Sequence, residues 1–541
     1  MYRFVLWMCY LRLVWPWPDA ARADPLLVNI VNGQLRGRDR GDYYSYESIP
    51  YAEPPVGNLR FEAPQPYKCQ WSEVFDATKP PEFCLQWSFF FHNTVLGKED
   101  CLTVNVYKPK NASRSSFPVL AYIHGGAFMF GGVMEYGHEY FMAAGNFIMV
   151  KITYRLGPLG FLSTGDANLP GNFGLKDQRL ALHWIKQNIA SFGGDPENIL
   201  LMGHSAGGAS VHYQLLHGGL DGMVKAAASL SGTALCPWAN QYNERQKAFK
   251  IGHILDCDTK GSSLELKKCL QSKDPRAIVG AVEQFLVFGY VPIAPFAPVV
   301  ETADTAEPFI TQHPADIMKS GKDSQIPWLM SYTLNEGGFN AALFLEKDDD
   351  DRELIEVLNT RWNELAPDLL FYRHTMNSSD DLNRYSQELK SQYLGDRDFS
   401  FDSYLDLQRM FTDVLFKNAI QKVIELNHSQ RKSPLYTYVY DNPPESGLGN
   451  WISGRTDVFF GTVHCDDLFL IVNTLLHGKL RADEQVISKN FLQMLIDFVE
   501  SDKGLLTYDK CEFKVIVGKS KIELVYITGE DCENKQVEKI P

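Results

Sequence analysis

Gly203-His204-Ser205-Ala206-Gly207 joins the apolar run of residues 199–202 to a helical pattern that begins at Gly208. A Gly-x-Ser-x-Gly between a strand and a helix places the serine on a sharp turn, with its hydroxyl exposed above a sheet. The flanking glycines leave room for so tight a reversal. The bare pattern also occurs by chance, so its strand-and-helix context is what makes it informative. The stretch predicts an activated nucleophile at Ser205 and favours a serine hydrolase.

A second glycine-rich stretch offers hydrogen-bond donors for a negatively charged oxygen. The apolar strand pattern of residues 119–123 runs directly into His124-Gly125-Gly126-Ala127-Phe128. In esterases, backbone N–H groups of such a loop form an oxyanion hole together with the N–H that follows the nucleophile. An ordinary glycine turn is the alternative interpretation of this loop alone. The predicted donors are the N–H groups of Gly126, Ala127 and Ala206, and Gly125 is the predicted turn residue.

Hydrolases of this kind carry an acid and then a histidine after the serine. The best candidate base is His464, which follows the strand pattern of residues 435–440 through a loop rich in glycine and proline. The best candidate acid is Glu336, which follows the strand pattern of residues 326–332. Glu336 would hold the imidazole of His464 in the tautomer that accepts the serine proton. Most of the 13 histidines must serve other purposes, and a loop glutamate is usually solvated, so spacing alone singles out neither residue.

Further motifs surround these residues. They are Glu99-Asp100-Cys101-Leu102-Thr103-Val104-Asn105-Val106-Tyr107, Tyr154-Arg155-Leu156-Gly157-Pro158, Gly171-Asn172-Phe173-Gly174-Leu175, Asp177-Gln178, Phe192-Gly193-Gly194-Asp195-Pro196, Ser231-Gly232-Thr233-Ala234-Leu235-Cys236-Pro237-Trp238, Asn335-Glu336-Gly337 and Gly461-Thr462-Val463-His464. Together they resemble the cholinesterase/carboxylesterase family of α/β-hydrolases, and its insect esterases most closely. The resemblance implies a hydrogen bond from Ser231 to the acid, although a capping role for Ser231 is equally open. It also implies the disulfides Cys84–Cys101 and Cys257–Cys269.

Strand and helix patterns alternate along the chain. Residues 26–35 alternate like an edge strand or hairpin, residues 147–154 are an apolar run typical of a buried strand, and residues 178–190 have one apolar helical face. This alternation predicts an α/β fold with a large, mostly parallel central sheet and helices on both faces. Residues 351–427 have a helical pattern, and the family resemblance implies that they cap the site. Because the site residues run from 124 to 464, residues 24–541 are expected to form one domain.

The composition argues against several other classes of protein. The 52 Lys and Arg against 66 Asp and Glu give a formal net charge of −14, and no basic run stands out. A nucleic-acid partner is therefore not expected. No His-Glu-x-x-His or Cys-x-x-Cys pattern occurs, and the acidic run of residues 348–351 does not match an EF-hand loop. We expect no metal and no cofactor, and a small-molecule ester as the binding partner; the sequence leaves the oligomeric state open.

The N-terminus has the features of a secretory signal peptide over residues 1–23. Arg3 precedes a mostly apolar stretch, which Arg12 interrupts, and Ala21-Arg22-Ala23 fits a cleavage site. No later segment has the roughly 18 apolar residues that a membrane span needs. The last residues match neither a retrieval signal nor a lipid-anchor tail. The sequence therefore predicts a soluble, secreted protein.

Of the 10 cysteines, Cys9 lies in the expected signal peptide. In an oxidising compartment several of the others should pair, and their odd number leaves at least one thiol free. Cys511 and Cys532 flank an apparent hairpin of residues 513–517 and 522–527 and are open candidates for a further pair. Cys465 is the first candidate for a free thiol, while Cys69 and Cys236 remain unassigned. The possible glycosylation acceptors are Asn111, Asn377 and Asn427.

The reaction expected from these residues is hydrolysis of a neutral, apolar carboxylic ester through an acyl-enzyme. The rivals are a cholinesterase, an insect esterase specialised for juvenile hormone, a pheromone or an odorant, and a non-catalytic adhesion relative. Adhesion relatives typically lack a triad residue and gain a membrane span. His204 precedes the nucleophile, where cholinesterases typically carry Glu and hormone esterases Gln. The Cys84–Cys101 loop is shorter than in cholinesterases, and the sequence alone assigns none of its aromatic residues to their choline-binding position; these residues are Trp87, Phe89, Phe90 and Phe91.

Overall fold

The computed structural model describes residues 24–88, 93–110, 114–258, 260–347, 352–427, 431–474, 476–501, 504–518 and 521–541. The expected signal peptide, the Asn111 sequon, Phe89, Phe90, Phe91 and the acidic run of residues 348–351 lie outside these ranges. No helix among the described residues is long and apolar enough to cross a membrane.

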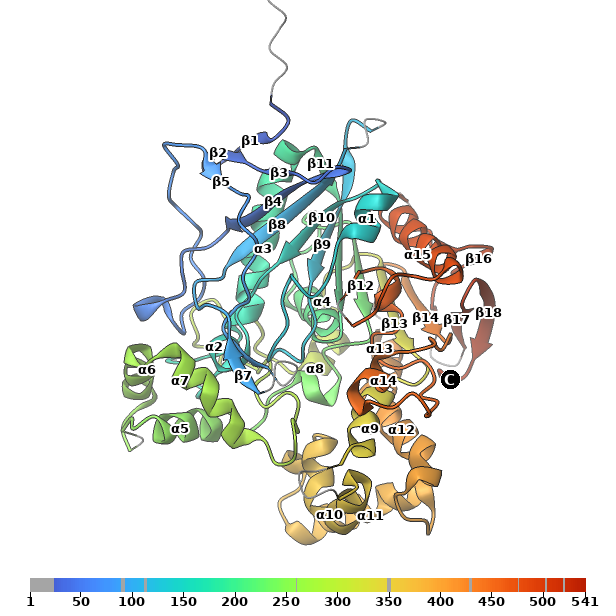
Figure 1. The fold of residues 1–541 in the computed structure, drawn as a ribbon. Coiled ribbons are helices and arrows are strands. Elements are labelled where there is room, and N and C mark those ends of the chain that lie inside the picture. The colour runs from blue at the N-terminus through green and yellow to red at the C-terminus, as the bar shows by residue number, and fades with distance from the viewer. Residues whose placement is uncertain are drawn as a thin grey trace, which may run out of the picture.

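An 11-stranded sheet forms the centre of the molecule (Figure 1). In spatial order its strands are β18 (Asp531–Val537), β17 (Ile522–Thr528), β14 (Leu435–Tyr440), β13 (Trp328–Thr333), β12 (Ala226–Leu230), β11 (Gly194–His204), β9 (Phe117–Ile123), β10 (Ile148–Ile152), β8 (Thr103–Pro109), β4 (Tyr43–Pro50) and β3 (Arg38–Asp39). The strands from β17 to β10 pair in parallel, whereas β18 at one edge and β8, β4 and β3 at the other pair antiparallel. The predicted mostly parallel sheet is confirmed.

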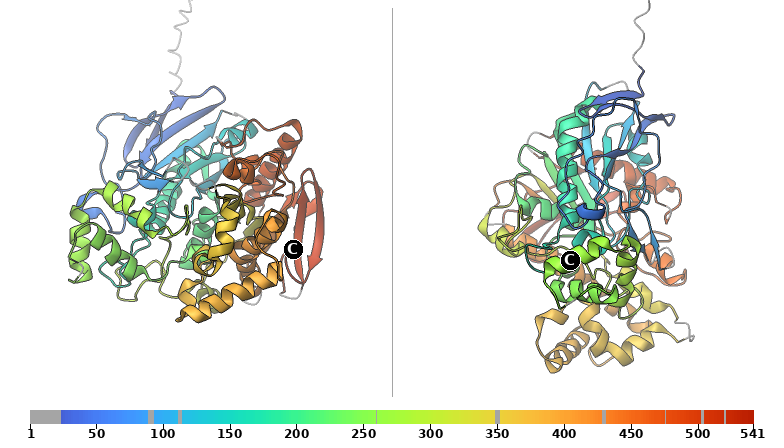
Figure 2. Two further views of the ribbon diagram at one scale, coloured as in Figure 1. Left: turned by 60° about the horizontal axis from the view of Figure 1, so that its bottom comes forward. Right: turned by 90° about the vertical axis from the view of Figure 1, so that its left-hand side faces the viewer.

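Both faces of the sheet are buried, because alternate residues of each central strand enter two different hydrophobic cores. In β9, Val119, Ala121 and Ile123 join the core beneath α3 (Phe173–Asn188) and α4 (Ala206–His217). Leu120 and Tyr122 join the opposite core, with α1 (Glu139–Ala144) and α15 (Ala482–Glu500). This double burial explains the uninterrupted apolar runs in the sequence. In the right-hand view of Figure 2, α3 (teal) and α15 (red) lie on opposite sides of the strands.

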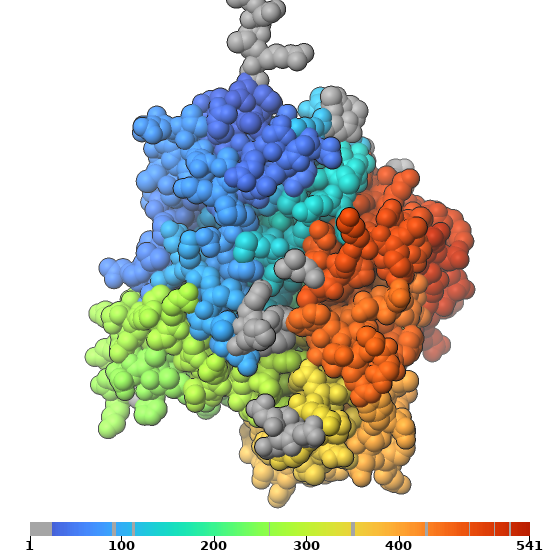
Figure 3. Space-filling view, viewed as in Figure 1, coloured from blue at the N-terminus to red at the C-terminus, as the bar shows by residue number. Residues whose placement is uncertain are grey.

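The remaining helices gather beyond one end of the sheet, at the bottom of Figure 1. They form the green and yellow-to-orange lower edge of the face in Figure 3. The main ones are α5 (Glu244–Ile254), α6 (Ser263–Ser272), α7 (Pro275–Gly280), α9 (Gly338–Ala342), α10 (Leu354–Leu369), α11 (Ser379–Leu394), α12 (Tyr404–Thr412), α13 (Asn418–Asn427) and α14 (Leu448–Ser453), with α2 (Gly157–Phe161) and α8 (Pro314–Ser320) nearer the sheet. A π-helical turn, Asp413–Lys417, joins α12 to α13. The helical pattern predicted for residues 351–427 is confirmed in the part of it that the structure describes.

Small sheets complete the fold and correct one expectation. The predicted N-terminal hairpin is present as β1 (Leu27–Ile30) and β2 (Gly33–Arg36), beside β5 (Phe75–Asp76). The hairpin predicted from residues 513–517 and 522–527 is wrong. β17 instead pairs with β18 through a tight turn at Gly529, whose φ of 78° favours glycine. The other pairs are β15 (Thr507–Tyr508) with β16 (Cys511–Glu512), and β6 (Gln86–Ser88) with β7 (Thr94–Leu96).

Three disulfides link six of the nine described cysteines. They are the two pairs that the family resemblance implied, Cys84–Cys101 and Cys257–Cys269, and the open candidate pair Cys511–Cys532. The third joins β16 to β18 and therefore fixes the C-terminal hairpin to the neighbouring small sheet. Cys69, Cys236 and Cys465 are free thiols, as expected for Cys465.

Candidate active site

Ser205 lies on the turn between β11 and α4, with φ 58° and ψ −122°. A Cβ on Gly207 would lie 2.1 Å from the Ile123 oxygen, and one on Gly203 would lie 2.4 Å from Gly207 backbone atoms, so neither glycine can be replaced without a shift. The Ser205 N–H donates to Leu230 O of β12 (2.8 Å). The serine is half-buried and lines a cavity. The sharp strand-to-helix turn predicted from the sequence is present.

The loop after β9 brings its backbone N–H groups to the same cavity. Gly126 has φ 109°, and a Cβ there would lie 2.0 Å from Phe130 O. Among the described residues, the N–H groups of Gly126, Ala127 and Ala206 donate to no acceptor. Gly126 and Ala127 line the cavity with Ser205, while Ala206 opens α4 and leaves its N–H at the helix N-terminus. These donors are therefore available to an oxygen that becomes negatively charged beside Ser205.

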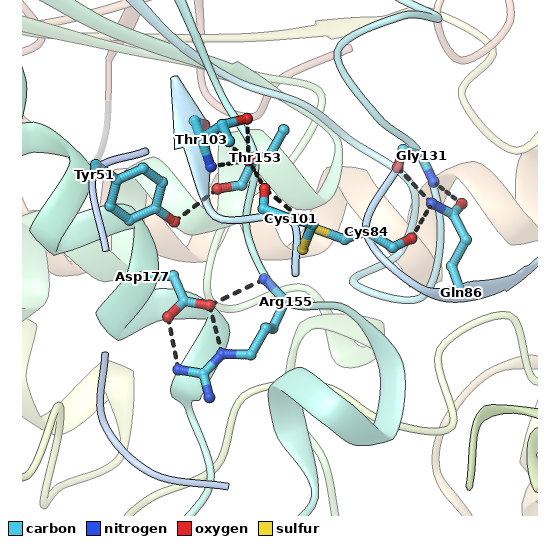
Figure 4. The surroundings of a disulfide bond; sticks show 9 residues. All are labelled: Tyr51, Cys84, Gln86, Cys101, Thr103, Gly131, Thr153, Arg155 and Asp177. Atoms are coloured by element: carbon cyan, nitrogen blue, oxygen red, sulfur yellow. Dashed lines mark hydrogen bonds and ion pairs between the residues drawn. A yellow bond between two sulfur atoms is a disulfide. The ribbon is translucent and has the colours of Figure 1, made fainter. Parts of the chain in front are cut away.

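Side chains that the sequence did not single out hold this loop in place (Figure 4). Gln86, two residues after Cys84, donates to Gly131 O (2.9 Å) and accepts from Gly131 N–H (2.7 Å). Its amide also donates to Cys84 O (2.9 Å). Gln86 thus joins the first disulfide loop to the turn that carries the free N–H groups. Only its position inside the disulfide loop could have signalled this role.

The other end of the loop is fixed by a buried histidine and a buried ion pair. His124 Nδ1 lies 2.8 Å from Gly125 O, and the Tyr154 hydroxyl donates to His124 O (3.0 Å). Burial lowers the pKa of His124 to about 4, so its ring is neutral at neutral pH. Next to Tyr154, Arg155 binds both oxygens of Asp177 in α3 (2.7 and 2.8 Å; Figure 4). Two of the family-like motifs therefore meet in one buried contact.

Glu336 and His464 come together from segments 128 residues apart. Glu336 follows β13 and is fully buried; its Oε1 accepts from Thr333 N–H (3.0 Å). Its Oε2 lies 2.5 Å from His464 Nδ1. The loops fit closely, because a Cβ on Gly338 would lie 2.3 Å from Val463. With Nδ1 engaged, Nε2 is the remaining nitrogen of His464, and His464 and Ser205 line the same cavity.

The two aspartates after His464 support its loop. Asp466 Oδ2 accepts from Val463 N–H (2.7 Å), and Oδ1 accepts from Leu448 N–H (3.3 Å). The Tyr438 hydroxyl donates to Asp467 Oδ2 (3.2 Å). Burial raises the pKa of Asp467 to about 7 and that of Asp466 well above its usual range. Neither carboxylate is bonded to His464 in the structure.

The predicted hydrogen bond from Ser231 to the acid is not formed. Ser231 Oγ is buried and has no hydrogen-bond partner among the described residues. Ser231 sits at a sharp bend with φ 52°, immediately after β12, and its backbone N–H donates to Ser331 O (2.9 Å). The Thr333 N–H, at the end of β13, donates to Glu336 Oε1 and so makes the hydrogen bond that was predicted for Ser231.

The cavity in front of Ser205 has a volume of about 220 Å³ and is mostly apolar. Its aromatic and aliphatic walls come mainly from the helices beyond the sheet and the loops near them; they include Phe130, Trp238, Ile293, Phe339, Phe371, Leu415, Phe416, Leu448, Trp451, Phe469 and Leu476. The indole N–H of Trp238 donates to Leu415 O in the π-helical turn (3.0 Å). Trp87, from the first disulfide loop, is buried elsewhere and donates to Glu283 (3.1 Å).

Among the described residues that line the cavity, Glu135 is the one acidic side chain, and no pattern in the sequence singles it out. Burial raises its pKa to about 7, although Gly132 N–H donates to it (3.1 Å) and opposes that shift. Below that pH the carboxyl is mainly neutral and fits an apolar wall. Above it, a charge develops next to the bound substrate.

We expect the KM of an apolar, uncharged ester to rise between about pH 6 and about pH 8, as Glu135 ionises in the cavity wall. The Glu135→Gln variant keeps the shape of the side chain but cannot ionise, so its KM should stay flat over this range. Steady-state kinetics of both proteins across the pH range measure the difference. Identical pH profiles of KM in the two proteins would show that Glu135 does not face the substrate.

Comparisons with known proteins identify the family of this chain. Residues 24–535 match the family model described as the carboxylesterase family. The chain is 59% identical to Esterase-5B of Drosophila miranda over 523 residues, covering 96% of each chain. It is 57% identical to Esterase-5A of Drosophila pseudoobscura pseudoobscura over 541 residues, covering 98% of this chain and 99% of that one.

A solved structure has the same fold. It is the crystal structure of juvenile hormone esterase from Manduca sexta with OTFP covalently attached, which matches with a TM-score of 0.79 and 23% identity over 95% of this chain and 96% of that one. The predicted α/β-hydrolase fold and the predicted kinship with insect esterases are both confirmed. The chain belongs to the carboxylesterase family and is a carboxylic-ester hydrolase.

Proposed function

We propose that this protein is a serine carboxylesterase that hydrolyses neutral, apolar esters through an acyl-enzyme. Ser205 Oγ attacks the ester carbonyl while His464 Nε2 takes its proton, and the buried Glu336 stabilises the imidazolium. The N–H groups of Gly126, Ala127 and Ala206 bind the oxyanion. His464 then protonates the departing alcohol and activates the water that releases the acid. The observation that carries the proposal is the 2.5 Å contact between Glu336 and His464 at the cavity that Ser205 also lines.

The walls of the cavity support the substrate class. Each methylene group buried there contributes about 0.8 kcal/mol to binding. A quaternary ammonium would need an aromatic face and a compensating charge. The aromatic faces are present, but Glu135, the one carboxyl among the described lining residues, has a pKa raised to about 7 and is only partly ionised at neutral pH. Trp87 does not line the cavity. Cationic substrates are therefore disfavoured relative to neutral ones.

A substrate panel tests this proposal. We expect kcat/KM to rise from 4-nitrophenyl acetate to 4-nitrophenyl butyrate, because the longer acyl chain buries more apolar surface. Acetylthiocholine and butyrylthiocholine should each trail the neutral ester of the same acyl group by about tenfold or more. Juvenile hormone belongs in the panel because the matched crystal structure is a juvenile hormone esterase. If kcat/KM for acetylthiocholine equals that for 4-nitrophenyl butyrate, the protein is a cholinesterase instead.

We further propose that residues 1–23 are a cleaved signal peptide and that residues 24–541 form one secreted domain. The three disulfides support an oxidising compartment. Of the described glycosylation candidates, Asn377 is exposed and Asn427 is buried, so Asn377 is the accessible acceptor. N-terminal sequencing of protein from the medium of expressing insect cells should begin at Asp24. Protein retained inside the cells with Met1 intact would contradict this proposal.

A further inference from the structure

Two histidines and a free thiol meet at the edge of the cavity. The metal-ligating atoms of His204, His464 and Cys465 all lie within 4.8 Å of one another. Cys465 Sγ is 3.9 Å from His204 Nδ1, and the two imidazole rings are 4.7 Å apart between centroids. All three residues line the cavity next to Ser205. Neither His204 nor Cys465 has a part in the proposed ester hydrolysis.

The groups have free ligating positions. His464 Nδ1 is engaged by Glu336, which leaves Nε2. His204 is fully buried, and its Nδ1 faces Cys465 Sγ; among the described residues this is the one hydrogen-bond contact of its ring, and the ion would replace it. Cys465 is not in a disulfide. A carboxylate bonded to the far nitrogen of a histidine, as Glu336 is here, is also the usual support of a metal-ligating imidazole.

We propose that His204, His464 and Cys465 bind a soft divalent cation of the Zn²⁺ class, and that the bound ion inhibits the enzyme. Two imidazoles and a thiolate are a preferred donor set for zinc. Bond lengths of about 2.3 Å to sulfur and about 2.1 Å to nitrogen put tetrahedral ligands roughly 3.6 Å apart. The 3.9 Å between Cys465 Sγ and His204 Nδ1 closes to this value with a shift of a few tenths of an ångström, and the other separations, which lie within 4.8 Å, need shifts of up to about 1.2 Å.

Binding has a defined proton balance and a defined consequence. The thiol of Cys465 loses its proton to solvent as the sulfur–metal bond forms, and the fourth coordination position is left to a water molecule in the cavity. The ion occupies the nitrogen that would accept the proton of Ser205. The inhibition thus rests on the proposed role of His464, whereas the binding itself does not. The ion is a reversible inhibitor and has no part in catalysis.

Spectroscopy of an inactive protein tests the binding alone. Ser205→Ala protein is titrated with Co²⁺, and the thiolate-to-metal absorbance is recorded in the near ultraviolet. We expect a band that saturates at about one ion per chain. Adding Cys465→Ser to the Ser205→Ala protein should abolish this band. Adding Cys236→Ser instead, at a buried free thiol, should leave the band unchanged. A band that survives Cys465→Ser, or no band in Ser205→Ala itself, would overturn the proposal.

Kinetics of the active enzyme test the inhibition. Micromolar Zn²⁺ should lower kcat/KM for 4-nitrophenyl butyrate about tenfold or more, and a chelator should restore it. Cys465→Ser and His204→Gln should each raise the Zn²⁺ concentration for half-inhibition about tenfold or more, since each removes one of three ligands. Circular dichroism checks that both variants are folded. Equal inhibition of the unmodified enzyme, Cys465→Ser and His204→Gln would show that the ion binds elsewhere and would overturn the proposal. If the enzyme without metal has no esterase activity, the proposed function fails, but the absorbance titration still tests metal binding.

Discussion

Replacement of Ser205 by alanine is expected to lower kcat for 4-nitrophenyl butyrate by about 10⁶-fold. The hydroxyl is the proposed nucleophile, and without it His464 and the oxyanion donors act only on the slow direct attack of water. The KM should change little, because the apolar walls of the cavity remain. Stopped assays at high enzyme concentration measure the residual rate, and an organophosphate followed by peptide mapping identifies the labelled residue.

A nearby serine provides the matched control. Ser231 is the same type of residue, but its hydroxyl is buried and makes no hydrogen bond to the residues that the structure describes. Ser231→Ala should therefore retain activity within about tenfold and still be labelled at Ser205. Label found on any other serine, or substantial turnover by Ser205→Ala, would contradict the assignment of the nucleophile.

Replacement of Glu336 by glutamine is expected to lower kcat by about 10⁴-fold. Both oxygens of Glu336 lie against N–H groups, Oε1 against Thr333 N–H and Oε2 against His464 Nδ1. A glutamine has one acceptor and one donor, so one of these contacts becomes donor against donor. If the NH₂ group of the glutamine faces the imidazole, it donates to His464 Nδ1 and favours the tautomer with the imidazole proton on Nε2. That tautomer cannot accept a proton from Ser205. The charge that stabilises the imidazolium is lost in either orientation.

Asp466→Asn is the matched control for Glu336→Gln, because Asp466 also accepts two N–H groups, in its case both from the backbone. Its contacts fix the loop and do not include His464. We expect a lower melting temperature and a loss of kcat below about tenfold, since an unsatisfied buried contact costs about 1–3 kcal/mol of stability. A larger loss of kcat in Asp466→Asn than in Glu336→Gln would identify Asp466 as the acid that orients His464.

The candidate site was largely predictable because its main signals are local. Ser205 stands in a five-residue pattern between a strand and a helix, and the loop of Gly126 follows an apolar strand directly. Glu336 and His464 carry weaker signals, since their loops resemble many others. Their selection depended on the family resemblance, and the 2.5 Å contact between them supports it.

The remaining features depend on tertiary contacts that no local pattern encodes. Gln86 looks like any polar residue until the first disulfide loop is folded against Gly131. Glu135 looks like a solvated acid until the cavity closes around it. Ser231 was predicted to donate a hydrogen bond to Glu336, but the Thr333 N–H donates to that carboxylate instead. The C-terminal hairpin was placed one strand too early, because residues 513–517 are as apolar as a strand but pack as a loop, with Ile516 N–H on Leu435 O (2.9 Å).

The π-helical turn Asp413–Lys417 joins the wall of the binding cavity to the loops that carry the catalytic residues. Such a turn accommodates one extra residue within an otherwise regular helix. Loss of a residue there would let α12 and α13 join as one α-helix, withdrawing Leu415 and Phe416 from the cavity and moving the carbonyl that holds Trp238. Ser205, Glu336 and His464 stand on other segments, but Thr412 of α12 accepts from Gly337 N–H (2.9 Å), next to Glu336, and the Phe416 ring lies 4.9 Å from that of His464. On this scaffold, a single-residue insertion or deletion in this helix is thus expected to change which esters fit and to alter the support of the catalytic histidine and acid at the same time.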